Sequence, residues 1–389
     1  MAGIYLHIPF CKQACYYCNF HFSTLVKNRS EMVNALLAEI DLQQDFFHAI
    51  PVAEKEVPVH TIYFGGGTPS LLEANDIQRL IQKIRGHFNV SGDPEITLEA
   101  NPDDISMEKL SAWRGAGVNR LSIGVQSFFE EDLKWMNRGH NARQALRCME
   151  DARKAGFDNF SADLIYGIPR QSDERWRENI NKMIALEVPH LSCYALTVEA
   201  RTPLDNFIRR GKYPPVDEAQ AARQYEMLME LLAEAGYEHY EISNFAKPGR
   251  RSVHNSNYWH GASYLGVGPS AHSYRGETRQ WNVTNNAVYV KSILEGRIPF
   301  EKETLTPVMQ LNEYIMTSFR TREGCDLDYL QSKWGPEEKR KMETESRKFR
   351  ERKWMTLKSG HLVLTSRGKL FADGIAAELF RERPAMPKK

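Results

Sequence analysis

Three of the six cysteines in the chain lie within eight residues, at Cys11, Cys15 and Cys18. Three thiols on one short loop cannot all pair with one another as disulfides, and thiolates that face one another need a cation. The C-x3-C-x2-C spacing lets one loop place three thiolates around a four-iron, four-sulfur cluster, and three protein ligands leave one iron free. The spacing therefore predicts an iron–sulfur centre whose open iron binds an exchangeable group.

A structural zinc ion is the main alternative for the same loop. His21 follows Cys18 at C-x2-H spacing and would complete a Cys3His zinc site. The apolar run from Tyr5 to Phe10 favours a strand that leads into a loop over a zinc knuckle, so we favour the iron–sulfur interpretation.

The run YLHIPFCKQACYYCNF resembles the cluster loop of the radical SAM superfamily, in particular the branch of oxygen-independent coproporphyrinogen III oxidases and HemW haem chaperones. The resemblance extends along nearly the whole chain. It implies that the open iron binds the amine and carboxylate of S-adenosylmethionine (SAM), whose reductive cleavage yields a 5′-deoxyadenosyl radical in this superfamily. The cluster and SAM would carry the chemistry, while the protein orients and shields them.

Composition limits the remaining function classes. The chain has 389 residues and 42% hydrophobic residues, enough for one large domain and a smaller one. Its 51 basic and 50 acidic residues nearly cancel, so we expect no nucleic-acid partner. No signal-peptide pattern and no run of about 18 apolar residues is present, which predicts a cytoplasmic protein.

Short β-rich runs alternate with longer helical patterns, which is typical of a parallel α/β sheet or barrel. Strands are predicted at 4–8, 61–64, 95–99, 120–125, 159–166, 190–196 and 237–242. Between the first two, apolar residues recur at helical spacing from Val33 to Ile40, with Ser30 as the candidate N-cap. The resemblance implies a partial, TIM-like (β/α)6 barrel.

Polar residues recur where successive predicted strands end. A glycine run leads to Thr68 after the second strand, Glu99 ends the third, Gln126 follows the fourth and Asp163 lies in the fifth. In barrels of parallel strands this face carries the active site, so the pattern predicts a site at one mouth.

Each of these residues also has an ordinary structural explanation. Consecutive glycines suit a tight turn, but after TIYF they favour backbone that closely approaches a ligand. A strand-end acid such as Asp163 is unfavourable in an empty core, which favours a bound ligand. The resemblance implies that the SAM site comprises Tyr5, Tyr17, Gly66, Gly67, Thr68, Glu99, Gln126, Arg138 and Asp163.

Two further stretches distinguish the branches of the family. The oxidases carry a further cysteine where this chain has Phe20, and HemW-like members carry phenylalanine. The chain also begins almost at its first strand, without the extension that precedes the loop in those oxidases. The run HNSNYW, from His254 to Trp259, resembles the HNxxYW element of HemW and would offer haem an imidazole and two aromatic rings.

The sequence therefore predicts a radical SAM partial barrel at 1–300 and an accessory domain at 301–389, a small α+β, winged-helix-like unit. We expect a 4Fe-4S cluster, SAM and haem as bound groups, with haem-accepting apoproteins and an electron donor for the cluster as partners. A homodimer and peripheral membrane contact through the acceptor stay open, as does the question of whether the chain is an enzyme. The alternative function is that of a coproporphyrinogen III oxidase, which decarboxylates two propionates to vinyl groups.

Overall fold

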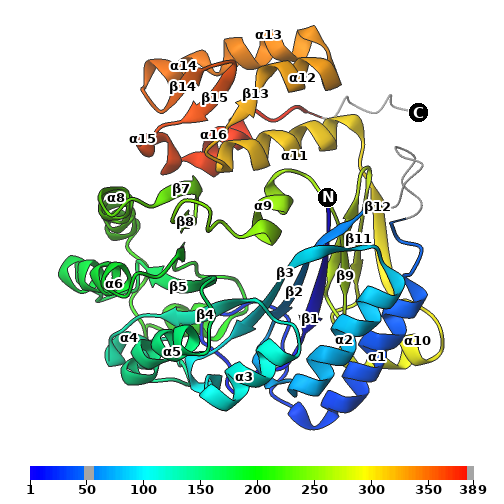
Figure 1. Cartoon of the computed structure of the whole chain (residues 1–389). Helices are drawn as coiled ribbons and strands as arrows, with labels where there is room; N and C mark the ends of the chain where they lie inside the picture. The colour runs from blue at the N-terminus through cyan, green and yellow to red at the C-terminus, as the bar shows by residue number, and fades with distance from the viewer. Residues whose placement is uncertain (48–56, 383–389) are drawn as a thin grey trace.

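The computed structural model describes residues 1–47 and 57–382. One twelve-stranded sheet forms the body of the molecule (Figure 1). Its central strands are parallel and adjacent in chain order, and they are β1 (Ala2–Ile8), β2 (Val59–Gly66), β3 (Val90–Ala100), β4 (Arg120–Gln126), β5 (Phe160–Tyr166) and β6 (His190–Ala195). The helices between them are α1 (Arg29–Leu42), α2 (Ala74–His87), α3 (Met107–Gly115), α4 (Glu130–Trp135), α5 (Ala142–Lys154) and α6 (Asp173–Ala185). This alternation confirms the predicted α/β fold with a partial TIM-like barrel.

Further strands extend the sheet at both edges. Beside β1 lie parallel β9 (Ser263–Val267) and then antiparallel β10 (His272–Arg275), β11 (Thr278–Asn282) and β12 (Phe300–Thr304). Beside β6 lie antiparallel β8 (Asn244–Ala246) and β7 (Glu238–Glu241). The connecting helices are α7 (Pro203–Arg209), α8 (Glu218–Glu234), α9 (Val253–Trp259) and α10 (Asn286–Leu294).

The outer face of the sheet forms the main hydrophobic core. Ile4, Leu6 and Ile8 of β1 are fully buried together with Leu36 and Ile40 of α1. Burial of such side chains contributes about 1.5–3 kcal/mol each, which holds the helices against the strands. The predicted N-cap at Ser30 is wrong, because α1 begins at Arg29 and Asn28 occupies the N-cap position.

The C-terminal residues fold around a core of their own, above the barrel in Figure 1. Their elements are α11 (Pro307–Arg320), β13 (Cys325–Asp326), α12 (Leu327–Trp334), α13 (Pro336–Glu345), α14 (Arg347–Glu351), β14 (Met355–Lys358), β15 (His361–Leu364), α15 (Ser366–Lys369) and α16 (Ala372–Glu378). The strand order β13-β15-β14, with helices between the first strand and the final hairpin, agrees with a small winged-helix-like unit.

Strand pairing shows to which unit the residues near the expected domain boundary at 300 belong. Phe300 to Thr304 form β12, which pairs with β11 in the large sheet, and α11 starts the second unit at Pro307. We therefore propose that the boundary lies between Thr304 and Pro307. The last seven residues of the expected second domain, 383–389, lie outside the described residues.

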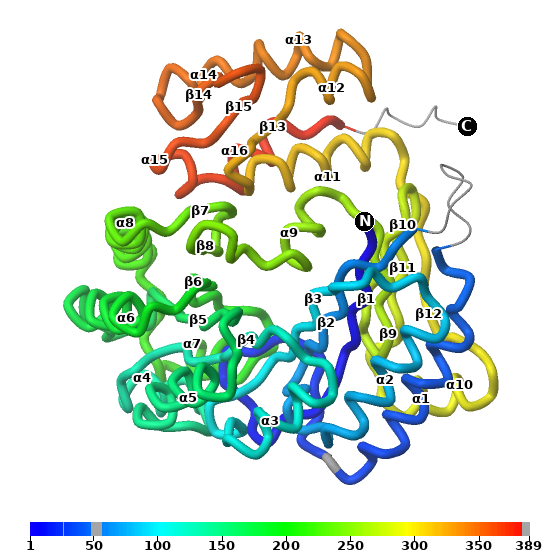
Figure 2. Tube along the Cα trace, in the orientation of Figure 1, coloured from blue at the N-terminus to red at the C-terminus, as the bar shows by residue number. Residues whose placement is uncertain are grey.

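Helix α9 lies between the barrel strands and α11 of the second unit, as the tube in Figure 2 shows. Within residues 1–47 and 57–382, none of the helices combines the length and the apolar character that a bilayer crossing requires.

Candidate functional site

The inner face of the parallel strands is lined by polar side chains. Residues paired across neighbouring strands share a face, and the register joins Tyr5 to Tyr63, Thr61 to Glu95 and Asp163 to Ser192. These positions alternate with the fully buried apolar positions that face α1 and α2. The concave side of the sheet is therefore suited to a polar ligand, and its C-terminal edge is the barrel mouth.

The cysteine loop begins at this mouth, where β1 ends, and backbone contacts with the end of β2 hold it there. The amide of Gly67 donates to the carbonyl of Ile8 (N–O distance 2.8 Å), and the amide of Thr68 donates to that of Phe10 (2.6 Å). A Cβ atom at Gly67 would lie 2.6 Å from the carbonyl oxygen of Phe10, and one at Gly66 would lie 2.8 Å from the ring of His7. The protein itself therefore requires glycine at both positions, and the predicted close approach of a ligand stays a prediction.

Cys11, Cys15 and Cys18 are half-buried, and two side chains donate to their sulfur atoms. Thr68 Oγ1 lies 3.7 Å from Cys11 Sγ, and Arg138 Nη1 lies 3.4 Å from Cys15 Sγ. Burial raises the pKa of Cys11 to about 11 and also raises the pKa of Cys18, with neighbouring thiols adding to both shifts. Three thiolates here need a compensating cation, so the donor set fits an iron–sulfur cluster.

The zinc alternative finds less support in the geometry. His21, its proposed fourth ligand, places Nε2 2.6 Å from Asn286 Oδ1 and stacks on His7.

Arg138 joins the cysteine loop to the ends of β3 and β4. Its Nη2 donates to Asn101 Oδ1 at 2.7 Å and to the carbonyl of Gly124 at 2.6 Å. Asn101 in turn donates to Thr68 Oγ1 at 3.0 Å. Burial disfavours the charged guanidinium, but Tyr17 and Cys15 outweigh this and raise the pKa of Arg138 above its usual value, so the side chain stays positive.

Gln126 lies beside this network with an unusual backbone. Its φ of 67° is in the left-handed region, where a non-glycine residue is uncommon, and its side chain is buried. Its Oε1 has no hydrogen-bond partner among the described residues. A buried oxygen of this kind favours a ligand or water at the same point.

Glu99 and Asp163 place two carboxyl groups on the inner face beneath the loop. Glu99 accepts a hydrogen bond from Tyr63 Oη at 2.8 Å and another from the amide of Gly66 at 3.1 Å. Burial raises the pKa of Glu99 to about 7, and the nearby Asp163 adds to the shift. Burial also raises the pKa of Asp163 to about 7, although a hydrogen bond from Ser192 opposes this rise. The pair would favour a cationic ligand.

The structure brings most predicted site residues together, and His254 adjoins them through Tyr5, whose ring centroid lies 6.5 Å from its own. His254 is 3% exposed, and its Nδ1 lies 2.7 Å from Thr61 Oγ1, near the start of β2 and away from the mouth. Its ring stacks on Tyr63 with a centroid distance of 4.8 Å, and Tyr5 stacks on Tyr63 at 6.0 Å. The role of His254 toward haem therefore stays a prediction, and in this structure its Nε2 is buried without a hydrogen-bond partner among the described residues.

Sequence reasoning missed three residues that organise this interior. Tyr63 bonds Glu99, Asn101 bridges Thr68 to Arg138, and Arg120 is 1% exposed beside Glu95. Residues two apart on a strand point to the same face, so the alternation in β2 from Thr61 to Tyr63 could have identified Tyr63 as an inner-face residue. Asn101 and Arg120 gain their roles from contacts between strands, which spacing along one strand does not reveal.

A polar partial barrel whose mouth carries a C-x3-C-x2-C loop defines the radical SAM class. The family model described as the radical SAM superfamily matches residues 5–183. The solved structure titled "Coproporphyrinogen III oxidase (HemN) from Escherichia coli is a Radical SAM enzyme" superposes with a TM-score of 0.83 at 22% identity. The superposition covers 97% of this chain and 90% of that one, and at this identity it shows the shared fold.

Curated relatives narrow the class further. The heme chaperone HemW of Mycobacterium tuberculosis is 35% identical over 97% of this chain and 94% of its own. The heme chaperone HemW of Escherichia coli is 40% identical over 69% of each chain. The chain belongs to the HemW family of the radical SAM superfamily.

Proposed function

We propose that this protein is a haem chaperone that binds a 4Fe-4S cluster, SAM and haem and passes haem to acceptor proteins. The observation that carries the proposal is the convergence at one mouth of the cysteine loop, Arg138 and the Glu99–Asp163 pair, in a chain whose relatives are named heme chaperones. Cytoplasmic location and an electron donor for the cluster follow from the same proposal.

In this proposal the residues divide into two groups. Cys11, Cys15 and Cys18 hold the cluster, and Arg138 offsets part of its negative charge through Cys15. The cluster and SAM, when bound, supply the capacity for one-electron reduction of the sulfonium. SAM is held by the side chains and backbone around the mouth, namely Tyr5, Tyr17, Gly66, Gly67, Thr68, Glu99, Gln126, Arg138 and Asp163.

In this proposal the carboxyl groups of Glu99 and Asp163 stabilise the positive charges of SAM. SAM carries a sulfonium and an ammonium group, and Glu99 and Asp163 are the nearby groups whose ionised forms burial disfavours. A bound cation stabilises the ionised carboxylates and is itself stabilised by them. Tyr63 and the amide of Gly66 hold the Glu99 carboxyl in place through its two oxygens.

Iron analysis of variants tests the cluster. Anaerobically reconstituted wild type should contain about four irons per chain, and replacement of Cys11, Cys15 or Cys18 by serine should abolish the iron–sulfur absorbance. Cys148→Ser is the matched control, because Cys148 is buried in α5 and bonds the carbonyl of Ala145. Stoichiometric zinc in wild type without iron–sulfur absorbance would refute the cluster assignment.

A parallel assay separates the chaperone from the oxidase. The reconstituted protein is incubated anaerobically with coproporphyrinogen III, SAM and a reductant, and separately titrated with haem. We expect a Soret band to develop with haem and no decarboxylated porphyrinogen to form. Formation of protoporphyrinogen would instead assign the oxidase function, and failure to bind haem would reject the chaperone.

A further inference from the structure

A haem carrier needs an imidazole that iron can reach, and exposure separates the histidines of this chain. His7, His140, His190 and His254 are at most 4% exposed. Three other histidines already have side-chain partners: His87 pairs with Asp41, His21 bonds Asn286 and His239 bonds Lys369. Across residues 1–47 and 57–382, only His260 and His272 have exposed side chains.

His272 lies on the concave inner face of the sheet, on its antiparallel extension. It pairs with Trp281 of β11, which pairs with Glu301 of β12, so the three side chains share one face. The next row on that face contains Tyr274, which pairs with Tyr264 of β9, and Tyr264 pairs with Gly3 of β1. Gly3 in turn faces His254 and Thr61 in the barrel interior.

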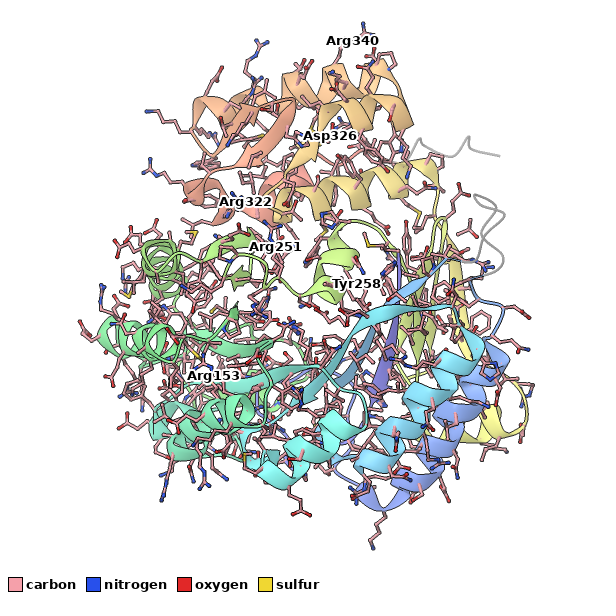
Figure 3. All side chains as sticks on the ribbon, viewed as in Figure 1. Arg153, Arg251, Tyr258, Arg322, Asp326 and Arg340 are labelled. Atoms are coloured by element: carbon pink, nitrogen blue, oxygen red, sulfur yellow. The ribbon has the colours of Figure 1, made fainter. Side chains whose placement is uncertain are left out.

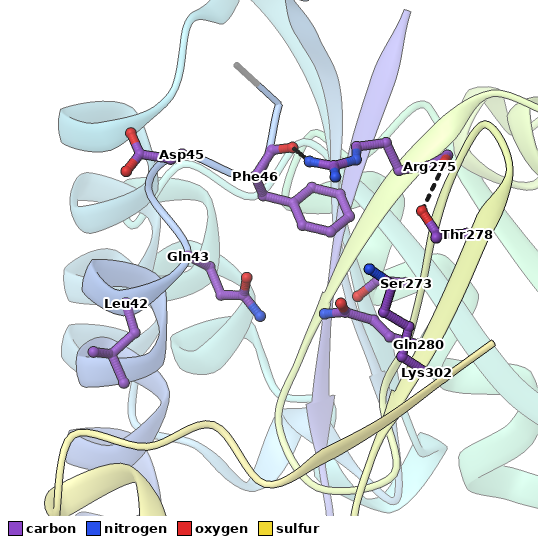
Figure 4. A pocket seen from close by; sticks show the side chains of 9 residues that line it. All are labelled: Leu42, Gln43, Asp45, Phe46, Ser273, Arg275, Thr278, Gln280 and Lys302. Atoms are coloured by element: carbon purple, nitrogen blue, oxygen red, sulfur yellow. Dashed lines mark hydrogen bonds between the residues drawn. The ribbon is translucent and has the colours of Figure 1, made fainter. Parts of the chain in front are cut away.

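The opposite face of the same strands is turned toward α1. A cavity of about 230 Å³ lies there, lined by Ser273, Gln280 and Lys302 from the strands and by Gln43 from the end of α1 (Figure 4). Arg275 reaches across it and donates to the carbonyl of Phe46 at 2.9 Å. Because neighbouring residues on a strand alternate in direction, His272 and Trp281 point away from this cavity. They face the side of the sheet that carries the candidate SAM site.

We propose that His272 is the axial ligand of the haem iron and that Trp281 supports the porphyrin. This assignment rests on the proposed haem-binding function. His272 and Trp281 stack at a centroid distance of 6.0 Å with their planes 28° apart. An imidazole bonds iron through a lone pair in its ring plane, so a porphyrin bound at His272 would lie across that plane. Because Trp281 stacks on the imidazole, its indole would offer the porphyrin an aromatic edge, a contact that aromatic pairs favour.

The surroundings of His272 suit this role. Partial burial and the Arg279 guanidinium lower the pKa of His272, which keeps its lone pair free at neutral pH. Three neighbouring strands span about 10 Å, comparable to the breadth of a porphyrin ring. The site adjoins the barrel mouth, because His272 lies close enough to His7 of β1 to interact with it electrostatically.

His260 provides a comparison. It follows α9, where it lies close enough to Glu323 to interact with it electrostatically. The adjacent Trp259 ring is covered by Arg320, whose guanidinium carbon lies 5.2 Å from the ring centroid. The indole beside His260 is thus already in contact with a cation, and this histidine is the matched control.

Haem titrations of wild type, His272→Ala and His260→Ala test the assignment. In His272→Ala the Soret band should shift and haem affinity should fall at least about tenfold, whereas His260→Ala should match wild type. Added free imidazole should restore the wild-type band in His272→Ala, which a purely structural role of His272 would not produce. Trp281→Leu should weaken binding without moving the band, because the iron ligand is retained.

The outcomes distinguish this inference from the proposed function. If wild type shows no Soret band, the chaperone function fails and the ligand assignment fails with it. If wild type binds haem and His272→Ala keeps both the band and the affinity, only the assignment of His272 is wrong. If His272→Ala loses haem and imidazole does not restore it, His272 is a structural residue and the assignment is again wrong.

Discussion

At the residue scale, the candidate site depends on two carboxyl groups that burial keeps near the balance between protonated and ionised forms. Burial raises the pKa of Glu99 and of Asp163 to about 7, and the nearby Asp163 adds to the shift of Glu99. Their folded pKa values exceed the unfolded ones, so the ligand-free protein loses stability as pH rises from about 4 through 7. A cation bound between them would remove that loss.

This balance predicts a pH dependence of SAM binding. If binding requires one ionised carboxyl with a pKa of about 7, the competent fraction rises about eightfold from pH 6 to pH 7.5. Calorimetry on the cluster-loaded protein should show affinity increasing accordingly. Glu99→Gln should bind more weakly at both pH values with a flatter profile, and equal affinity of wild type at both pH values would contradict the assignment.

The same residues show how far a sequence can predict a site. The cysteines are identified by spacing, and Glu99, Gln126 and Asp163 by their positions at strand ends, because both signals are local. His254 could not be placed in this way. Its exposure depends on how α9 docks beneath β1 and β2, where His254 bonds Thr61 and stacks on Tyr63.

At the element scale, the structure depends on how loops and short helices attach to the barrel. Seven-residue α9 is held by Glu95 of β3, whose carboxylate accepts the amides of Val253 at 3.0 Å and His254 at 2.9 Å. Arg120 lies 3.7 Å from the same carboxylate. An acid at the N-terminus of a helix is stabilising, and this contact explains why the HNSNYW run faces inward. The strands and long helices were predicted because their apolar periodicity is local, whereas this attachment joins residues far apart in sequence.

The attachment of the cysteine loop gives a prediction at this scale. Gly67→Ala would place a Cβ 2.6 Å from the carbonyl oxygen of Phe10 and 2.8 Å from its amide nitrogen. Both are backbone atoms, so the clash can be relieved only by moving the chain itself. The loop should be displaced and the iron content after reconstitution should fall well below that of wild type. Gly86→Ala in α2 is the control, since nothing lies within 4 Å of its added Cβ and helix propensity should stabilise it by about 1 kcal/mol. Full iron content in Gly67→Ala would show that the loop is not fixed by this contact.

At the scale of the whole molecule, the barrel and the C-terminal unit are joined by charged and backbone contacts. Arg251 bonds Glu238 of β7 at 3.1 Å and Glu323 beyond α11 at 3.0 Å, and Arg322 lies beside the same junction (Figure 3). The amide of Ile242 also donates a hydrogen bond to the carbonyl of Arg320 at 3.0 Å across the junction. Helix α9 lies between the two units and contacts β1 and β2 of the barrel as well as α11.

Lys369 is a half-buried cation at this junction and gives a prediction for the whole molecule. Its Nζ lies 2.9 Å from His239 Nδ1, and burial lowers the pKa of Lys369 to about 8, although Glu241 opposes the shift. Between pH 8 and about 10.5 the folded state binds fewer protons at this residue than the unfolded state does, so its contribution to stability rises with pH across that window. Relative to wild type, Lys369→Met should therefore lose about 2 kcal/mol of unfolding free energy between pH 7 and pH 10, whatever the sign of the difference at pH 7.

Urea unfolding of both proteins at the two pH values measures this change, since groups that titrate equally in both proteins cancel in the difference. Lys348→Met is the control, because Lys348 is half-exposed on the same unit and pairs with Glu378 at the surface. A difference for Lys369→Met that stays constant between pH 7 and pH 10 would show that Lys369 keeps its proton in the folded junction, and the contact with His239 would then be a charged one.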